Sequence, residues 1–259
     1  MLLAGQSSAW EHVRIEYAKI SLTGDRRDNQ DRVAIAVSER AAMLLVFDGM
    51  GGHSDGALAA QVALESVQKD FAGAEHPVFD PQGFLYAAIG RAHDAVVAVG
   101  AATDVDHRPR ATGALCLVQD QASWWAHVGD SRIYQVRGGR IRGRTRDHSH
   151  VEVLLREGVI DEQEAREHPM RNFVESCLGG DQALPGITVT RKKPLQSGDV
   201  LIACTDGLWS GLGEREIARI AGRSDQAVVE NLRELGERAV RANGPHSDNT
   251  TAASIRWLG

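Results

Sequence analysis

The sequence predicts an α+β fold, a four-layer α-β-β-α sandwich in which two mostly antiparallel sheets pack face to face between pairs of helices. Three observations predict it. Short strand-like segments are numerous along the 259 residues, and several are joined by tight connections. The helical segments come in pairs. The length suits one domain over residues 1–259, because folds of this kind commonly run to about 250 residues without splitting.

The first half of the chain supplies three strands and one pair of helices. Strands are expected at 13–22, 33–37 and 41–47, with a polar, turn-rich segment at 23–31. Helices are expected at 56–71, capped by Ser54, and at 81–99, where apolar side chains recur at helical spacing. This pair should cover one face of a sheet.

The second half repeats the pattern around an insertion. Strands are expected at 114–118, 123–127, 132–136, 187–190, 200–204 and 250–257, and helices at 214–221 and 224–242. Residues 145–180 carry two helical stretches, 149–157 and 159–168, and then show no clear period. We expect this segment to lie over the sheet edge as a mobile lid, or flap.

Composition indicates a globular protein without a nucleic-acid or membrane partner. Hydrophobic residues make up 42%, and 29 Lys plus Arg against 35 Asp plus Glu give a net charge of -6. No run approaches the ~20 apolar residues that span a bilayer. Residues 1–10 lack the basic start and apolar segment of a signal peptide. We therefore expect a cytoplasmic protein whose three dispersed cysteines are reduced.

Carboxylates recur where strands end. An apolar run leads into Asp48 and then into glycines, and a similar strand–aspartate–glycine pattern recurs at Asp206. The other aspartates at strand boundaries are Asp31, Asp130 and Asp248. If these ends converge, the clustered carboxylates repel one another and call for a cation between them.

Magnesium or manganese fits such a cluster, since hard cations take oxygen ligands and no histidine or cysteine set favours zinc. Two such ions about 3.5–4 Å apart can lower the pKa of a bridging water and stabilise displacement at phosphorus. The pattern therefore predicts hydrolysis of a phosphate ester. A Rossmann site is disfavoured by the negative charge of Asp48, and a P-loop by the absence of its Gly-Lys-Ser/Thr.

Three further features admit two interpretations each. Arg26 is a candidate for gripping the phosphate, or a surface arginine in a polar turn. His53 is a candidate proton donor to the leaving group, or a loop residue. The arginines of the 137–146 hairpin form either a solvated basic face or a substrate contact.

Five motifs follow one another along the chain. They are Arg26-Arg27-Asp28-Asn29-Gln30-Asp31, Phe47-Asp48-Gly49-Met50-Gly51-Gly52-His53, Val128-Gly129-Asp130-Ser131-Arg132, Cys204-Thr205-Asp206-Gly207-Leu208-Trp209 and Ser247-Asp248-Asn249-Thr250. In this order they resemble the motif series of type 2C protein phosphatases, the metal-dependent PPM class, in its bacterial form. The resemblance covers residues 16–257.

The resemblance implies a protein serine/threonine phosphatase that cleaves phosphoserine and phosphothreonine by direct attack of a metal-bridging hydroxide, opposing a bacterial Ser/Thr kinase. It implies two manganese or magnesium ions held by Asp48, the Gly49 carbonyl, Asp206 and Asp248. Asp31 would act mainly through metal-bound water, and a third, weaker ion would use Asp130 with Asp206. Arg26 would bind the substrate phosphate, and residues 145–180 would be the flap. We expect a monomer.

Some positions depart from the family pattern. Gln30 stands where many relatives carry glutamate, and Met50 stands where eukaryotic members have a histidine thought to protonate the leaving group. Thr112-Gly113-Ala114 replaces the usual glycine-threonine-threonine. Two other functions stay open: a metal-binding pseudophosphatase that recognises a phosphoprotein without cleaving it, and a small-molecule phosphatase.

Overall fold

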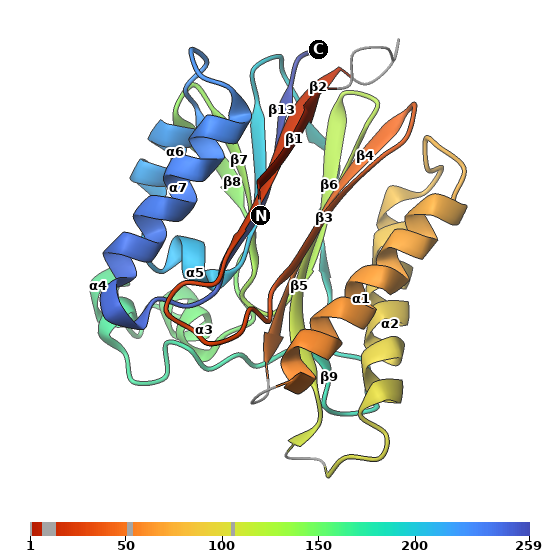
Figure 1. Ribbon diagram of the computed structural model, residues 1–259, viewed down its shortest axis with the longest axis vertical. Coiled ribbons are helices and arrows are strands. Elements are labelled where there is room, and N and C mark those ends of the chain that lie inside the picture. The colour runs from red at the N-terminus through yellow and green to blue at the C-terminus, as the bar shows by residue number, and fades with distance from the viewer. Residues whose placement is uncertain (1, 7–13, 51–53, 105–106) are drawn as a thin grey trace.

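Two antiparallel sheets form the middle of the molecule (Figure 1). The computed structural model describes residues 2–6, 14–50, 54–104 and 107–259. The first sheet has the order β1 (Leu2–Gln6), β2 (Ile15–Leu22), β13 (Thr250–Trp257), β12 (Val200–Cys204), β7 (Arg132–Arg137), β8 (Arg140–Arg144). The second has the order β10 (Thr188–Val189), β6 (Ala122–Val128), β5 (Arg110–Gln119), β4 (Ala41–Met50), β3 (Arg32–Val37). The short strands β11 (Lys193–Pro194) and β9 (Leu178–Gly179) pair with β6 and β5.

Helices cover the outer face of each sheet (Figure 1). On the second sheet lie α1 (Ser54–Gly73) and α2 (Pro81–Val99), and on the first lie α5 (Asp206–Trp209), α6 (Glu214–Ala221) and α7 (Val228–Asn243). A short 3-10 turn, Gly244–His246, follows α7. The predicted α+β class, with two antiparallel sheets between helices, is confirmed.

Among the described residues, three apolar clusters hold the layers together, and β4 shows why they form. Its side chains alternate, with Met43, Leu45 and Phe47 packed under α1 and α2 while Leu44 and Val46 pack between the sheets. A strand buried on both faces must be apolar at every position. This accounts for the unbroken apolar run that leads to Asp48.

Several element boundaries differ from the sequence-based ones. β4 continues through Asp48 and Gly49 to Met50, because these residues pair with residues 110–112 of β5. α7 begins at Val228 and not at residue 224. At this start, the Val228 N–H donates a hydrogen bond to the Glu16 carboxylate at 2.7 Å. That cap comes from a residue 212 positions away, which local sequence does not reveal.

Residues 145–180 cross one end of the sandwich from β8 to β9 (Figure 1). They contain α3 (His150–Arg156) and α4 (Glu162–Glu167), which are close to the two predicted helical stretches. Backbone hydrogen bonds join His150 to Phe173 and Glu175 to His148, so the two ends of this stretch lie together. Within the described ranges, every helix is too short or too polar to cross a bilayer.

Candidate active site

Strand ends bring the five predicted aspartates to one region. Asp48 lies near the end of β4, Asp31 directly precedes β3, and Asp206 opens α5 after β12. Asp130 joins β6 to β7, and Asp248 lies two residues before β13. Antiparallel pairing of neighbouring strands places these ends at the same edge of the sandwich.

Electrostatic interaction among the carboxylates indicates that they lie near one another. The pKa of Asp48 is held well above its usual range, first by removal from water and then by the negative charges of Asp31, Asp206, Asp130 and Asp248. Asp130 is buried, and its pKa is raised by removal from water and by the Asp206 charge. Residues spread over more than two hundred positions thus form one acidic cluster.

Asp31 is the least exposed member of the cluster, and only one of its two carboxylate oxygens has a hydrogen-bond partner among the described residues. Burial, opposed by hydrogen bonds from Thr251 and Thr205, raises its pKa to about 7. The Thr205 hydroxyl donates to Oδ2 of Asp31 at 3.0 Å, while Oδ1 is buried and has no hydrogen-bond partner among the described residues. An unpaired buried carboxylate oxygen is costly unless a proton or a cation satisfies it.

Asp206 has a similar environment at the start of α5. Burial raises its pKa to about 6, the Asp248 charge adds to this, and the Gly207 N–H, Arg26 and Arg132 oppose it. Because the cluster is protonated more readily than free carboxylates, a divalent cation would displace protons on binding.

The residues present fit magnesium or manganese. All five clustered side chains are carboxylates, the donors that hard cations prefer. Among the residues that the structure describes, no three His, Cys, Asp or Glu side chains form a ready-made ligand set for one ion. Magnesium is commonly bound by one or two carboxylates and keeps several waters, so a compact cage is not required.

Gly49 lies inside β4, where α1 comes unusually close. A Cβ at this position would lie 2.1 Å from the Gly56 carbonyl oxygen of α1, so no larger residue fits. Gly49 continues the strand, and its missing side chain permits the close approach of a helix to that strand. His53 lies outside the described residues.

Arg26 stands at the rim of the cluster. Its Nη2 donates to Oδ2 of Asp248 at 2.7 Å, and its side chain is 58% exposed. The guanidinium therefore already contacts one of the predicted metal ligands and retains donors that face solvent.

Asn249 holds the loop that carries Arg26, a role that the sequence did not reveal. Its Oδ1 accepts from the Gln30 N–H at 2.8 Å, and its Nδ2 donates to the carbonyls of Thr23 and Asp28 at 2.8 and 3.0 Å. Gly24 adopts a positive φ in this loop, and a Cβ there would lie 2.3 Å from the Asp248 carbonyl oxygen. The only local signal was the Asp248-Asn249 pair itself.

The basic hairpin is largely neutralised by the protein's own carboxylates. Arg137 makes two 2.6 Å bonds to Asp199, and Arg146 pairs with Glu152 at 3.2 Å. Arg144 pairs with Glu152 at 3.4 Å and with Glu214 at 2.7 Å. These contacts favour the structural interpretation of the hairpin over a substrate contact.

The chain is similar in sequence to known protein phosphatases. The family model described as protein phosphatase 2C matches residues 24–243. A putative protein phosphatase 2C-type from Streptococcus pyogenes is 30% identical over 243 residues, covering 92% of this chain and 96% of the relative. The serine/threonine protein phosphatase PstP of Mycobacterium tuberculosis is 30% identical over 231 residues, 89% of this chain. The chain spans 43% of the length of that relative.

Solved structures agree with this class. The catalytic domain of the serine/threonine protein phosphatase PstP in complex with two manganese ions matches with a TM-score of 0.78 at 27% identity. That match covers 95% of this chain and 99% of the other. The chain belongs to the protein phosphatase 2C family, in the PPM class to which its bacterial relatives belong. It is a phosphoprotein phosphatase, a hydrolase of phosphoric monoesters.

Proposed function

We propose that the chain removes phosphate from phosphoserine and phosphothreonine in proteins, using two manganese or magnesium ions held by Asp48, the Gly49 carbonyl, Asp206 and Asp248. Asp31 and Asp130 complete the site, with Asp130 and Asp206 available to a third ion. The observation that carries the proposal is the cluster of five carboxylates, each contributed by a different strand end. The manganese-containing PstP structure supports the choice of ion.

The bound ions would supply a nucleophile near neutral pH and neutralise charge on the phosphoryl group. The protein's own residues prepare this chemistry. Thr205 fixes the Asp31 carboxylate by its 3.0 Å bond and leaves Oδ1 free to accept a hydrogen bond within the site. Arg26 extends from the rim, where its planar fork can grip two phosphate oxygens. His53 remains a candidate proton donor.

The same proposal includes the protein's wider setting. Residues 1–259 would form one phosphatase domain, with 145–180 as a flap that selects substrates. The substrates would be products of a bacterial Ser/Thr kinase. The free cysteines Cys116, Cys177 and Cys204 are consistent with a reducing cytoplasm, and we expect a monomer.

Hydrolysis of a phosphothreonine peptide with manganese tests the proposal. We expect release of inorganic phosphate that stops when a chelator is added and resumes when manganese is restored. Metal binding without turnover would overturn it in favour of a pseudophosphatase. Faster turnover of sugar phosphates than of phosphopeptides would overturn it in favour of a small-molecule phosphatase.

A further inference from the structure

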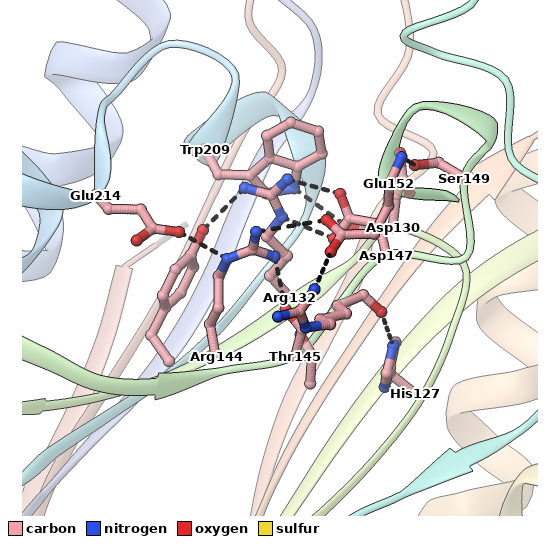
Figure 2. Close-up of polar contacts among 12 residues, drawn as sticks. His127, Asp130, Arg132, Arg144, Thr145, Asp147, Ser149, Glu152, Trp209 and Glu214 are labelled. Carbon is pink, nitrogen blue, oxygen red and sulfur yellow. Dashed lines mark hydrogen bonds and ion pairs between the residues drawn. The ribbon is translucent and has the colours of Figure 1, made fainter. Parts of the chain in front are cut away.

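Beside the acidic cluster lies a partly buried cation–aromatic contact that the chemistry above does not use (Figure 2). Arg132 lies in β7, two residues after Asp130. Its guanidinium carbon lies 3.6 Å from the centroid of the Trp209 ring. The Arg132 side chain is only 14% exposed, so this contact is largely shielded from water.

The same guanidinium is fixed on its other sides. Nε and Nη2 donate to the two carboxylate oxygens of Asp147 at 2.8 and 2.6 Å, and Nη1 donates to the Tyr134 hydroxyl at 3.2 Å. The Asp147 side chain is 6% exposed. A bidentate pair of this kind sets the orientation of the guanidinium plane as well as its position.

Trp209 connects this contact to the acidic cluster. Its Nε1 donates to the backbone carbonyl of Asp130 at 3.0 Å. It is the last residue of α5, the helix that Asp206 opens three residues earlier. The stacked pair therefore joins the loop that carries Asp130 to the helix that carries Asp206, although β7 and α5 are far apart in sequence.

Burial of Arg132 with Asp147 has a large desolvation cost, which makes stability alone a weak reason for the pair. Fixing one particular geometry is a better-supported role for a buried ion pair than stabilising the fold. Here the geometry concerns two carboxylates that repel each other and whose separation decides whether a cation can bridge them.

We propose that Arg132 and Trp209 are positioning residues that hold the Asp130 loop at a fixed distance from Asp206. Asp147, at the start of the 145–180 segment, holds Arg132 in the stack. The inference rests on the proposed function, because it assigns the pair to the bridging of a divalent cation between Asp130 and Asp206. In this role neither Arg132 nor Trp209 would need to contact the reacting atoms.

Two conservative variants test this. Trp209→Phe keeps an aromatic ring under Arg132 but removes the donor to the Asp130 carbonyl, and Arg132→Lys keeps the charge but loses the fork. Arg137→Lys is the matched control, because Arg137 lies on the same strand and makes a similar bidentate pair with Asp199 away from the acidic cluster. Manganese binding is measured by calorimetry on the full chain, with thermal unfolding as a check on folding.

We expect Trp209→Phe and Arg132→Lys to weaken, by about tenfold, the same manganese-binding step that Asp130→Asn weakens. Arg137→Lys should stay within about twofold of the wild type. In the Asp130→Asn background, Trp209→Phe should add less than about twofold, because both changes act through one carboxylate.

Unchanged manganese binding in both variants would overturn the inference, as would a Trp209→Phe effect that persists in full without the Asp130 carboxylate. The calorimetric measurement does not depend on turnover. A wild-type protein that binds manganese but cleaves no phosphopeptide would therefore refute the proposed function while leaving the positioning test intact.

Discussion

At the scale of single residues, the site depends on carboxylates whose charged form is unfavourable unless a cation or a proton neutralises it. Asp31 has one oxygen bonded to Thr205 and one buried oxygen with no partner in the described part of the chain. Asp48 is surrounded by four like charges. Removing a charge from this cluster should relieve repulsion and at the same time weaken metal binding.

Asp48→Asn and Asp206→Asn are expected to lower turnover by several orders of magnitude, because phosphate monoesters hydrolyse extremely slowly without catalysis. Both variants should fold at least as stably as the wild type in chelator, since each removes repulsion. Phosphate release from a phosphopeptide and thermal unfolding measure the two effects. Near-normal turnover in either variant would remove that residue from the metal site.

Arg26→Ala is expected to raise KM for a phosphopeptide by about tenfold or more, because a charge-assisted bidentate contact contributes roughly 1.5–3 kcal/mol. Arg27→Ala is the matched control, since Arg27 is the exposed neighbour of Arg26 in the same loop. Steady-state kinetics separate KM from kcat. Equal KM values for the two variants would argue against a phosphate-binding role for Arg26.

Residue types and strand ends could be predicted from sequence, but their partners could not. The five aspartates follow or precede apolar runs, which is a local signal. Thr205 donates to a carboxylate 174 positions away, and Asn249 accepts from an amide 219 positions away. Such contacts exist only once the sheets have formed, so the supporting residues escaped prediction.

At the scale of elements, segments with a clear period were predicted well, and elements that form only by pairing with a distant strand were mostly missed. The bounds of α2 and α6 agree with the predicted ranges, because each has a continuous helical period and a clear beginning. The strands β9 and β11 are two residues long each, too short for a period to be detected, whereas β10 lies within the strand expected at 187–190. β1 was not predicted, and it forms by pairing with β2.

The 145–180 segment exposes apolar side chains that a substrate could cover. Phe173 is 52% exposed, in the stretch that pairs back to α3. Phe173→Ser is expected to raise KM for a phosphoprotein about fivefold, the loss of roughly 1 kcal/mol of apolar contact, and to leave p-nitrophenyl phosphate turnover unchanged. Kinetics on the two substrates provide the comparison.

Phe79→Ser is the control for that prediction, because Phe79 is fully exposed in the connection between α1 and α2. It should change neither rate. Equal losses on both substrates in Phe173→Ser would indicate a general effect on folding and would contradict a substrate-selecting flap.

At the scale of the whole molecule, the acidic cluster links stability to pH and to metal. The pKa of Asp31 is about 7 and that of Asp206 about 6 in the folded protein, against 3.8 ordinarily. At pH values between 3.8 and about 6 to 7, the folded protein therefore binds more protons than the unfolded chain. The stabilising contribution of the protonated groups is therefore present at low pH and is lost as pH rises through about 6 to 7.

In chelator, the free energy of unfolding is expected to fall more between about pH 5 and about pH 8 in the wild type than in Asp31→Asn. Denaturant unfolding at several pH values measures this. The pKa of buried His127 is lowered to about 4, so its contribution to the free energy of unfolding rises with pH, opposite to that of Asp31. Because His127 is present in both proteins, comparison with the variant isolates the contribution of Asp31. Identical pH profiles would contradict the raised pKa of Asp31.

Manganese at the higher pH should restore the lost stability, since an ion that binds only the folded state stabilises it by mass action. The ion would take over from the protons in neutralising the cluster. This exchange of protons for manganese connects the fold to the function. The strand ends bring the carboxylates together, and their mutual repulsion favours binding of a cation.

The most direct test is anomalous diffraction at the manganese absorption edge from crystals grown with manganese. From the proposed function we expect two peaks about 3.5–4 Å apart among Asp48, Asp206 and Asp248. An absence of peaks beside these three carboxylates in crystals that contain manganese elsewhere would contradict the account.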